Sequence, residues 1–256
     1  MSSRSPDQSC DHGAMTTVVL VAGAWHGAWC WDLVLARLLA CGVSARTVEL
    51  PGRGVDTGTP TDLPGDVERV REVLSAVTGP ILLVGHSYGG AVITEAGAHP
   101  AVTELVFLAG FPLTESESVQ SAASEEAGRI DHSGRPKFRF TGSEQDILIL
   151  DAAASIAVLY GDCDPETQRW ASTRLGPQLK ASLSQSPRVV AWRNRPSTYA
   201  VCTQDNAVHP DLQRILARRC TRFVEWASGH SPFLSHPDWV ADLLAERAAA
   251  QSDVHP

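Results

Sequence analysis

The sequence predicts an α/β fold in which a mostly parallel sheet is covered by helices on both faces. Short apolar runs of strand length alternate with segments of helical periodicity along the chain. The runs are mostly apolar and the first is fully so, as expected of parallel strands that are buried on both faces. This alternation stops between Gly110 and about Arg195 and then resumes. A gap of that length inside one α/β domain indicates an inserted subdomain.

The expected strands are short, and turn residues follow the first two. Gly23 comes after the first run, and Pro51 and Gly52 close the second. In chain order the strands are expected at Val18–Val21, Ala45–Leu50, Pro80–Val84, Thr103–Leu108, Thr198–Thr203 and Arg222–Trp226.

Helices are expected between these strands, where apolar residues recur at helical spacing. Asp62 or Asp66 could cap the second helix. The core helices are expected at about Trp29–Ala40, Asp62–Val77, Gly89–Ala98, Pro210–Arg219 and Pro237–Ala249. The insertion is expected to hold a hairpin of Lys137–Phe140 with Asp146–Leu150, and helices at Ala152–Tyr160 and Pro165–Leu175.

Composition excludes several classes of protein. The formal net charge of −8 and the lack of a basic run argue against a nucleic-acid partner. No apolar stretch approaches the roughly 18 residues that span a membrane. The six cysteines are scattered without a CxxC pair, which predicts reduced, mostly buried thiols and a cytoplasmic location. Residues 1–14 are polar and read as a disordered tail, and the last residues as a second frayed end.

A serine between glycines follows the third expected strand, in the stretch "VGHSYGG" at residues 84–90. Gly-x-Ser-x-Gly alone can arise by chance, but here a strand precedes it and small residues follow. This turn strains the serine and lifts its hydroxyl clear of the backbone, so bulky neighbours would clash. It also lies at the carboxyl end of a middle strand, where α/β sheets place their sites. Ser87 is therefore the predicted nucleophile.

A serine nucleophile needs a base, and the base needs a group that orients it. For this kind of turn the chain order is serine, acid, histidine. His230 directly follows the last expected strand, and Asp205 is the only carboxylate at the end of the strand before. A surface-loop histidine and a helix cap are the alternative interpretations of these two. Asp162 and Asp164 read better as helix caps.

Attack on a carbonyl also requires N–H donors for the oxyanion. One is the N–H of Tyr88, directly after the nucleophile. The loop after the first strand should supply the other, and Gly23 lets the backbone turn there so that the N–H of Ala24 is expected. His26 is expected to fix this loop by hydrogen bonds, and His86 to be a packing residue.

The serine turn, the acid and histidine after later strands, and the loop after the first strand together resemble the α/β-hydrolase superfamily. Within it, the chain resembles the branch of plant methyl esterases and hydroxynitrile lyases with their bacterial relatives. The resemblance implies the α/β-hydrolase fold and carries the triad onto Ser87, Asp205 and His230. It also implies a lid, placed at 112–192, over a largely apolar pocket, with the core at 15–111 and 193–250. The stretches that carry it are "VLVAGAWHGAWCW" (19–31), "ELPGRG" (49–54), "VGHSYGG" (84–90), "YGDCDPE" (160–166), "TYAVCTQDNAVHPDLQ" (198–213) and "ASGHSPFLSHPDWVADLL" (227–244).

The function that follows is hydrolysis of a small carboxylic ester or lactone, without metal or cofactor, by a monomer or homodimer. The lyases usually carry Thr in place of Gly23 and Lys in place of Ser231, which disfavours a lyase. A lyase or cyclase of secondary metabolism and a non-enzymatic small-molecule receptor remain as alternatives. Candidate pocket residues, which could equally pack among themselves, are Gly23, Trp25, Phe138, Phe140, Leu159, Tyr160 and Trp170.

Overall fold

The computed structural model describes most of the chain. The tail expected at residues 1–14 and the last four residues lie outside the described part, as does Cys10. The other five cysteines are free thiols, three of them buried. Within the described ranges, none of the helices combines the length and the apolar composition that crossing a membrane requires. The described residues are 15–54, 58–127, 130, 133–142 and 146–252.

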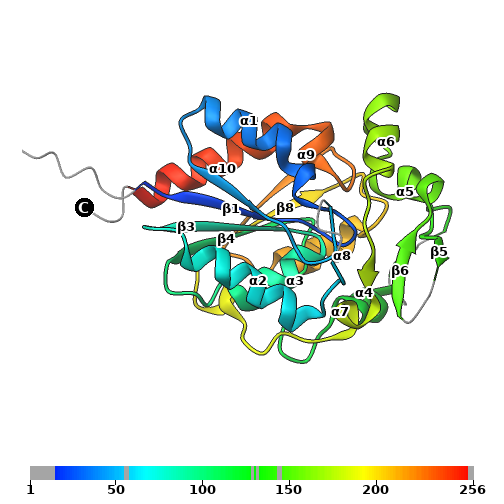
Figure 1. Cartoon of the computed structure of the whole chain (residues 1–256), viewed down its shortest axis with the longest axis horizontal. Helices are drawn as coiled ribbons and strands as arrows, with labels where there is room; N and C mark the ends of the chain where they lie inside the picture. Colours follow the sequence, from blue (N-terminus) through cyan, green and yellow to red (C-terminus); the bar gives the residue numbers. More distant parts are fainter. Residues whose placement is uncertain (1–14, 55–57, 128–129, 131–132, 143–145, 253–256) are drawn as a thin grey trace, which may run out of the picture.

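Six strands form a parallel central sheet in the order β2-β1-β3-β4-β8-β9 (Figure 1). All residues of β1, β3 and β8 are buried, which explains why most residues of these runs are apolar. The predicted strands and their parallel arrangement are confirmed. Their bounds are β1 (Thr17–Val21), β2 (Ala45–Val48), β3 (Ile81–His86), β4 (Val102–Leu108), β8 (Ser197–Cys202) and β9 (Arg222–Trp226).

Helices cover both faces of the sheet, as expected. The core helices are η1 (Ala28–Trp31), α1 (Asp32–Ala40), α2 (Leu63–Ser75), α3 (Tyr88–Ala96), α8 (Pro210–Ala217), α9 (Pro232–Ser235) and α10 (Pro237–Ser252). In Figure 1, α1 and α10 lie on one side of the sheet, and α2 and α3 on the other. Asp62 caps α2, because its side chain accepts the N–H of Gly65 at 3.1 Å. Asp66 is not the cap; it lies buried one turn further on and pairs with Arg53.

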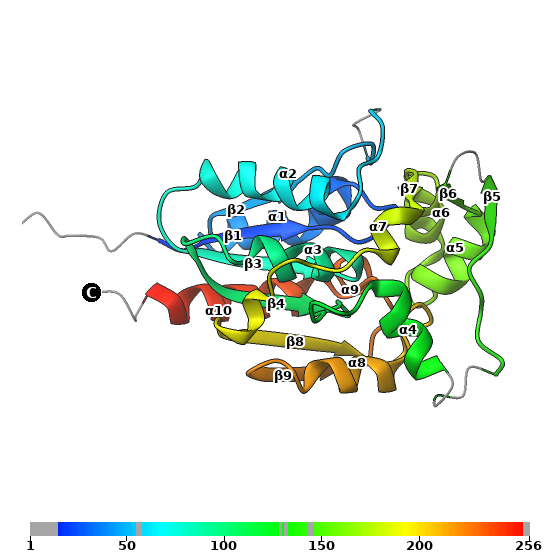
Figure 2. The same cartoon turned by 90° about the horizontal axis from the view of Figure 1, so that it is seen from below.

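The segment proposed as a lid, 112–192, lies mainly at the carboxyl ends of the strands (Figure 2). The expected hairpin is present, but its first strand begins at Phe140, which pairs with Leu150. Two helices, α4 and α7, were not expected, and both are short. The elements of this segment are α4 (Val119–Ala127), β5 (Phe140–Gly142), β6 (Ile147–Leu150), α5 (Ala152–Leu159), α6 (Pro165–Ser172), β7 (Gln178–Leu179), α7 (Lys180–Ser184) and η2 (Ala191–Arg193).

Candidate active site

Ser87 lies in the sharp turn between β3 and α3. Its backbone has φ 50° and ψ −121°, a conformation that residues with a side chain rarely adopt. A Cβ on Gly85 would lie 2.5 Å from the carbonyl oxygen of Gly89, and a Cβ on Gly89 would lie 2.6 Å from that of Ala22. Both positions therefore require glycine. The turn presents Ser87 at the carboxyl end of a central strand.

Asp205 and His230 follow the neighbouring strands β8 and β9, and their side chains meet. His230 Nδ1 lies 2.7 Å from Asp205 Oδ2, and both side chains are buried. Because an ionised carboxylate only accepts, Nδ1 carries the proton and Nε2 is left as a base. Asp205 Oδ1 accepts the N–H groups of Ala207 and Val208 at 2.6 and 2.9 Å, and Oδ2 also accepts from Gln213 Nε2 at 2.7 Å. These donors fix the carboxylate in one orientation.

The histidine of the pair shares a cavity with the serine. Ser87 and His230 both line it, although no hydrogen bond joins Ser87 Oγ to His230 Nε2 in the part of the chain that the structure describes. In unliganded active sites such bonds are often long and tighten only when substrate binds. The arrangement fits the roles expected of these residues, namely a nucleophile, a base of defined tautomer and an acid that orients the base.

Two further histidines near the site are held in structural roles. His86 donates through Nε2 to the backbone carbonyl of His230 at 2.9 Å, and burial lowers its pKa, with a smaller contribution from the nearby His230. His26 donates through Nδ1 to the carbonyl of Ala24 at 3.0 Å, and its Nε2 accepts from the Tyr160 hydroxyl at 2.8 Å. Burial lowers the pKa of His26 to about 3, so the ring is neutral. The expectation that His26 fixes its loop is confirmed.

The residues expected to donate to the oxyanion lie beside the nucleophile. Tyr88 is the first residue of α3, so its N–H has no acceptor within the helix. Ala24 lies on the loop after β1, and both residues line the cavity with Ser87. A Cβ on Gly23 would lie 3.0 Å from Ser87 Cβ and 2.7 Å from His86 Nδ1. Gly23 itself does not line the cavity, but its lack of a side chain lets the loop pass this close to the turn.

The cavity beside Ser87 has a volume of about 200 Å³, and most of the side chains around it are apolar. Besides Gly23, two expected pocket residues, Tyr160 and Trp170, do not line it. The Tyr160 hydroxyl is engaged by His26, and Trp170 packs edge-on against Trp29 with ring centroids 5.1 Å apart. The expected residues that do line it are Trp25, Phe138, Phe140 and Leu159.

Other wall residues were not found from the sequence. Phe111 follows β4 at the same sheet edge as Ser87, so its place after a strand end could have indicated it. Val119 and Ala123 are four residues apart on α4 and therefore share a face, but the helix itself was not expected. The missed wall residues are Phe111, Val119, Ala123, Leu183, Ala207 and Val208.

Other carboxylates that could be considered as the orienting acid point elsewhere. Glu115, which follows β4, is exposed and forms an ion pair with Arg193. Asp164 caps α6, as expected. Asp162 is not a cap: its Oδ2 accepts the N–H of Gly229 at 2.6 Å. It therefore contacts the loop that carries the histidine, and not the histidine ring.

Comparison with known proteins gives consistent matches. Residues 18–243 match the model of the alpha/beta hydrolase family. The chain is 28% identical over 253 residues to alpha/beta hydrolase nvfD of Aspergillus novofumigatus, covering 93% of this chain and 98% of the relative. It is 28% identical over 250 residues to putative methylesterase 14, chloroplastic, of Arabidopsis thaliana, covering 90% and 71%. The crystal structure of polyneuridine aldehyde esterase shares the fold, with a TM-score of 0.78 at 18% identity over 92% and 100% of the two chains.

Proposed function

Because the chain belongs to the alpha/beta hydrolase family and is an esterase-type hydrolase, we propose that it cleaves a carboxylic ester or lactone of a small, largely apolar substrate through an acyl-enzyme. The observation that carries this proposal is the buried contact of 2.7 Å between Asp205 and His230, because His230 lines the same cavity as Ser87. The named esterases among the relatives support the reaction class.

In the first step Ser87 Oγ attacks the carbonyl carbon of the ester, and His230 Nε2 takes the hydroxyl proton. Asp205 keeps the other proton on Nδ1 and stabilises the imidazolium that forms. The same imidazolium then donates its Nε2 proton to the leaving alcohol oxygen, which leaves the acyl group on Ser87.

In the second step water attacks the acyl-enzyme while His230 Nε2 takes its proton. Collapse of the second tetrahedral intermediate returns that proton to Ser87 and releases the carboxylic acid. In both steps the carbonyl oxygen becomes negative, and the N–H groups of Ala24 and Tyr88 stabilise it. Each such donor lowers the barrier by about 3–4 kcal/mol.

The size of the cavity limits the substrate. A volume of about 200 Å³ is below the range of roughly 300–1,000 Å³ that is usual for drug-sized ligands. Among the described residues, its walls present aromatic and aliphatic side chains next to Ser87 and no carboxylate or ammonium group. We therefore expect a short apolar acyl or alcohol group to be buried there.

The test is hydrolysis of p-nitrophenyl esters of increasing acyl length by the wild type and by Ser87→Ala. We expect activity on short esters, an initial burst of p-nitrophenol, loss of activity in the variant, and labelling of Ser87 by a fluorophosphonate. A wild type that is inactive on all esters, or a variant that keeps full activity, refutes the proposal. Cleavage of a cyanohydrin without any burst would favour a lyase instead.

A further inference from the structure

The peptide between Ala24 and Trp25 is bound at both of its polar atoms. Its carbonyl oxygen accepts from His26 Nδ1 at 3.0 Å, and its N–H donates to Gln178 Oε1 at 3.4 Å. Trp25 has φ 64°, a conformation that L-residues hold only when their surroundings enforce it. These two bonds fix the plane of the peptide, and with it the backbone of Ala24, whose N–H is the proposed oxyanion donor.

Both bonds depend on the segment proposed as a lid. Gln178 is in β7, and the hydroxyl of Tyr160, directly after α5, donates to His26 Nε2 at 2.8 Å. That contact leaves Nε2 as the acceptor and Nδ1 as the donor, the tautomer that binding of the carbonyl requires. The same segment makes a third contact, in which the N–H of Gly176 donates to the Trp25 carbonyl at 2.8 Å.

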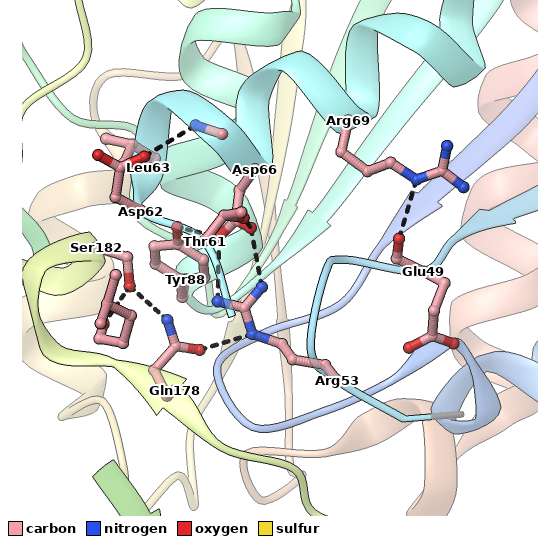
Figure 3. Close-up of polar contacts among 12 residues, drawn as sticks. Glu49, Arg53, Thr61, Asp62, Leu63, Asp66, Arg69, Tyr88, Gln178 and Ser182 are labelled. Carbon is pink, nitrogen blue, oxygen red and sulfur yellow. Dashed lines mark hydrogen bonds and ion pairs between the residues drawn. The ribbon is translucent and has the colours of Figure 1, made fainter. Parts of the chain in front are cut away.

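A buried ion pair holds Gln178 in place (Figure 3). Arg53 Nε donates to Gln178 Oε1 at 3.0 Å. The two terminal nitrogens of Arg53 donate to the two carboxylate oxygens of Asp66 at 3.0 and 3.1 Å, and both side chains are fully buried. Asp66 Oδ2 in turn accepts the hydroxyl of Tyr88 at 2.6 Å. The ion pair is therefore connected to both proposed oxyanion donors. Arg53 reaches the Trp25 N–H, beside Ala24, through Gln178, and Asp66 binds the side chain of Tyr88.

Stability alone is a weak explanation for this ion pair, because apolar side chains of similar volume often stabilise a core as well as or better than a buried ion pair does. A bidentate, charge-assisted pair adds geometric precision instead. Oxyanion donors need such precision, since they act only when aimed at the position of the developing charge.

We propose that Gln178 and Tyr160 are positioning residues for the oxyanion hole, holding the Ala24–Trp25 peptide so that the Ala24 N–H points at the reacting carbonyl when the lid segment is docked. This inference rests on the proposed function. It assigns to the lid segment a contribution to the rate of the chemical step, in addition to covering the substrate.

Gln178→Met tests it, because methionine has a similar length and removes the acceptor for the Trp25 N–H. Gln185→Met is the matched control. Gln185 also joins the lid segment to the core, accepting the N–H of Leu63 at 2.8 Å and donating to Asp62 at 3.0 Å. In the part of the chain that the structure describes, its side-chain hydrogen bonds reach neither the loop after β1 nor Arg53.

For each variant, kcat and KM are measured on a short p-nitrophenyl ester, together with the Ki of a trifluoromethyl ketone, which forms an oxyanion on the serine. We expect Gln178→Met to lower kcat and to weaken binding of the ketone by a similar factor, about tenfold or more. The effect should stay below the 10²–10³-fold loss of kcat that removal of a whole donor causes. KM should change little, and Gln185→Met should leave kcat and Ki within about twofold. Equal losses in the two variants, or a change in KM alone, overturn the inference.

Tyr160→Phe keeps the inference testable if Gln178→Met does not fold. It removes one hydroxyl, leaves the ion pair intact, and should also lower kcat and weaken the ketone without raising KM. A folded Tyr160→Phe variant with unchanged kcat and Ki overturns the role of Tyr160. Wild-type protein that hydrolyses no ester would refute the proposed function and this inference together, whereas an active wild type with unaffected variants refutes the inference alone.

Discussion

Asp205→Asn is the sharpest test of the candidate triad, because the surroundings of Asp205 determine how the amide must lie. Oδ1 accepts the two backbone N–H groups of Ala207 and Val208. An asparagine must keep its oxygen at that position, or two buried N–H groups lose their acceptor. Its NH₂ group then takes the place of Oδ2, which lies 2.7 Å from both His230 Nδ1 and Gln213 Nε2.

Gln213 cannot turn to accept from this amide. Its Oε1 accepts the N–H of Cys202 at 2.8 Å, and its Nε2 donates to the carbonyl of Val208 at 2.8 Å. His230 must therefore accept at Nδ1, which moves its proton to Nε2. That tautomer cannot take the proton of Ser87.

The expected loss is large. The corresponding change in a serine protease lowers kcat by about 10⁴-fold, or roughly 5.4 kcal/mol at 1.36 kcal/mol per tenfold. The donor–donor contact with Gln213 should also lower the free energy of unfolding, by about 1–3 kcal/mol. Both effects come from the replacement of one carboxylate oxygen by an NH₂ group.

The assay is kcat/KM on a short p-nitrophenyl ester at neutral pH, with circular dichroism to confirm that the variant is folded. Asp162→Asn is the control. Asp162 is also a carboxylate that contacts the His230 loop, through the N–H of Gly229, and its amide can still accept from that N–H. We expect the control to stay within about threefold of wild type. A folded Asp205→Asn variant that retains a tenth of wild-type activity, or a control that loses as much, would refute the reasoning.

Three other predictions concern stability and substrate size. The pKa of His26 is about 3 in the folded protein and about 6.5 in an unfolded chain, so His26 takes up a proton only on unfolding between these values. The free energy of unfolding should therefore fall by about 2 kcal/mol from this group between pH 7 and pH 5, and urea titrations should show a pH dependence that is smaller by that amount in His26→Gln. Leu183 lies on the cavity wall, so Leu183→Ala should enlarge the cavity and shift the preferred p-nitrophenyl ester to a longer acyl chain. An unchanged preference would exclude contact between Leu183 and the acyl group. Gly85→Ala places a methyl group 2.5 Å from a backbone oxygen, whereas in the control Gly161→Ala the nearest backbone oxygen is 3.4 Å away. Urea titrations should therefore show that the free energy of unfolding falls by about 1–3 kcal/mol or more in Gly85→Ala only.

The core, and the meeting of the three candidate triad residues at one edge, could be predicted because their signals are local. Ser87, Asp205 and His230 each follow the end of a strand, and the carboxyl ends of parallel strands meet at one sheet edge. Chain order and strand position therefore identify the residues that the structure brings to this edge. The glycines beside the nucleophile belong to the same local pattern, since the turn excludes a Cβ there.

The lid segment could not be predicted to the same depth, because side-chain directions there depend on how the segment docks. Tyr160 and Trp170 have the composition of pocket walls, yet one contacts His26 and the other packs on Trp29. Arg53 is a further case. No role was expected for it from the sequence, but the structure buries it completely in a bidentate contact with Asp66.

Backbone strain is concentrated at the same sheet edge as the site. Among the described residues, three of the four non-glycine positions with positive φ are Trp25 (64°), Ser87 (50°) and Ala109 (44°). They follow β1, β3 and β4, which are neighbours in the sheet. Each such conformation costs about 1–3 kcal/mol and persists only where the surroundings enforce it. Strain gathered on three adjacent strands indicates that this edge is shaped for function at the expense of stability.

Ser87 allows the strain to be measured. Ser87→Gly and Ser87→Ala both remove the hydroxyl, so both should be inactive, but only glycine adopts φ 50° and ψ −121° without steric cost. At an unstrained position alanine would be more stable than glycine, by about 0.5–1 kcal/mol, because glycine loses more freedom on folding. Relief of about 1–3 kcal/mol should reverse that order and leave Ser87→Gly about 1 kcal/mol more stable in urea unfolding. If Ser87→Ala is equally or more stable, the turn stores no strain, and the positive φ of Ser87 carries no information about function.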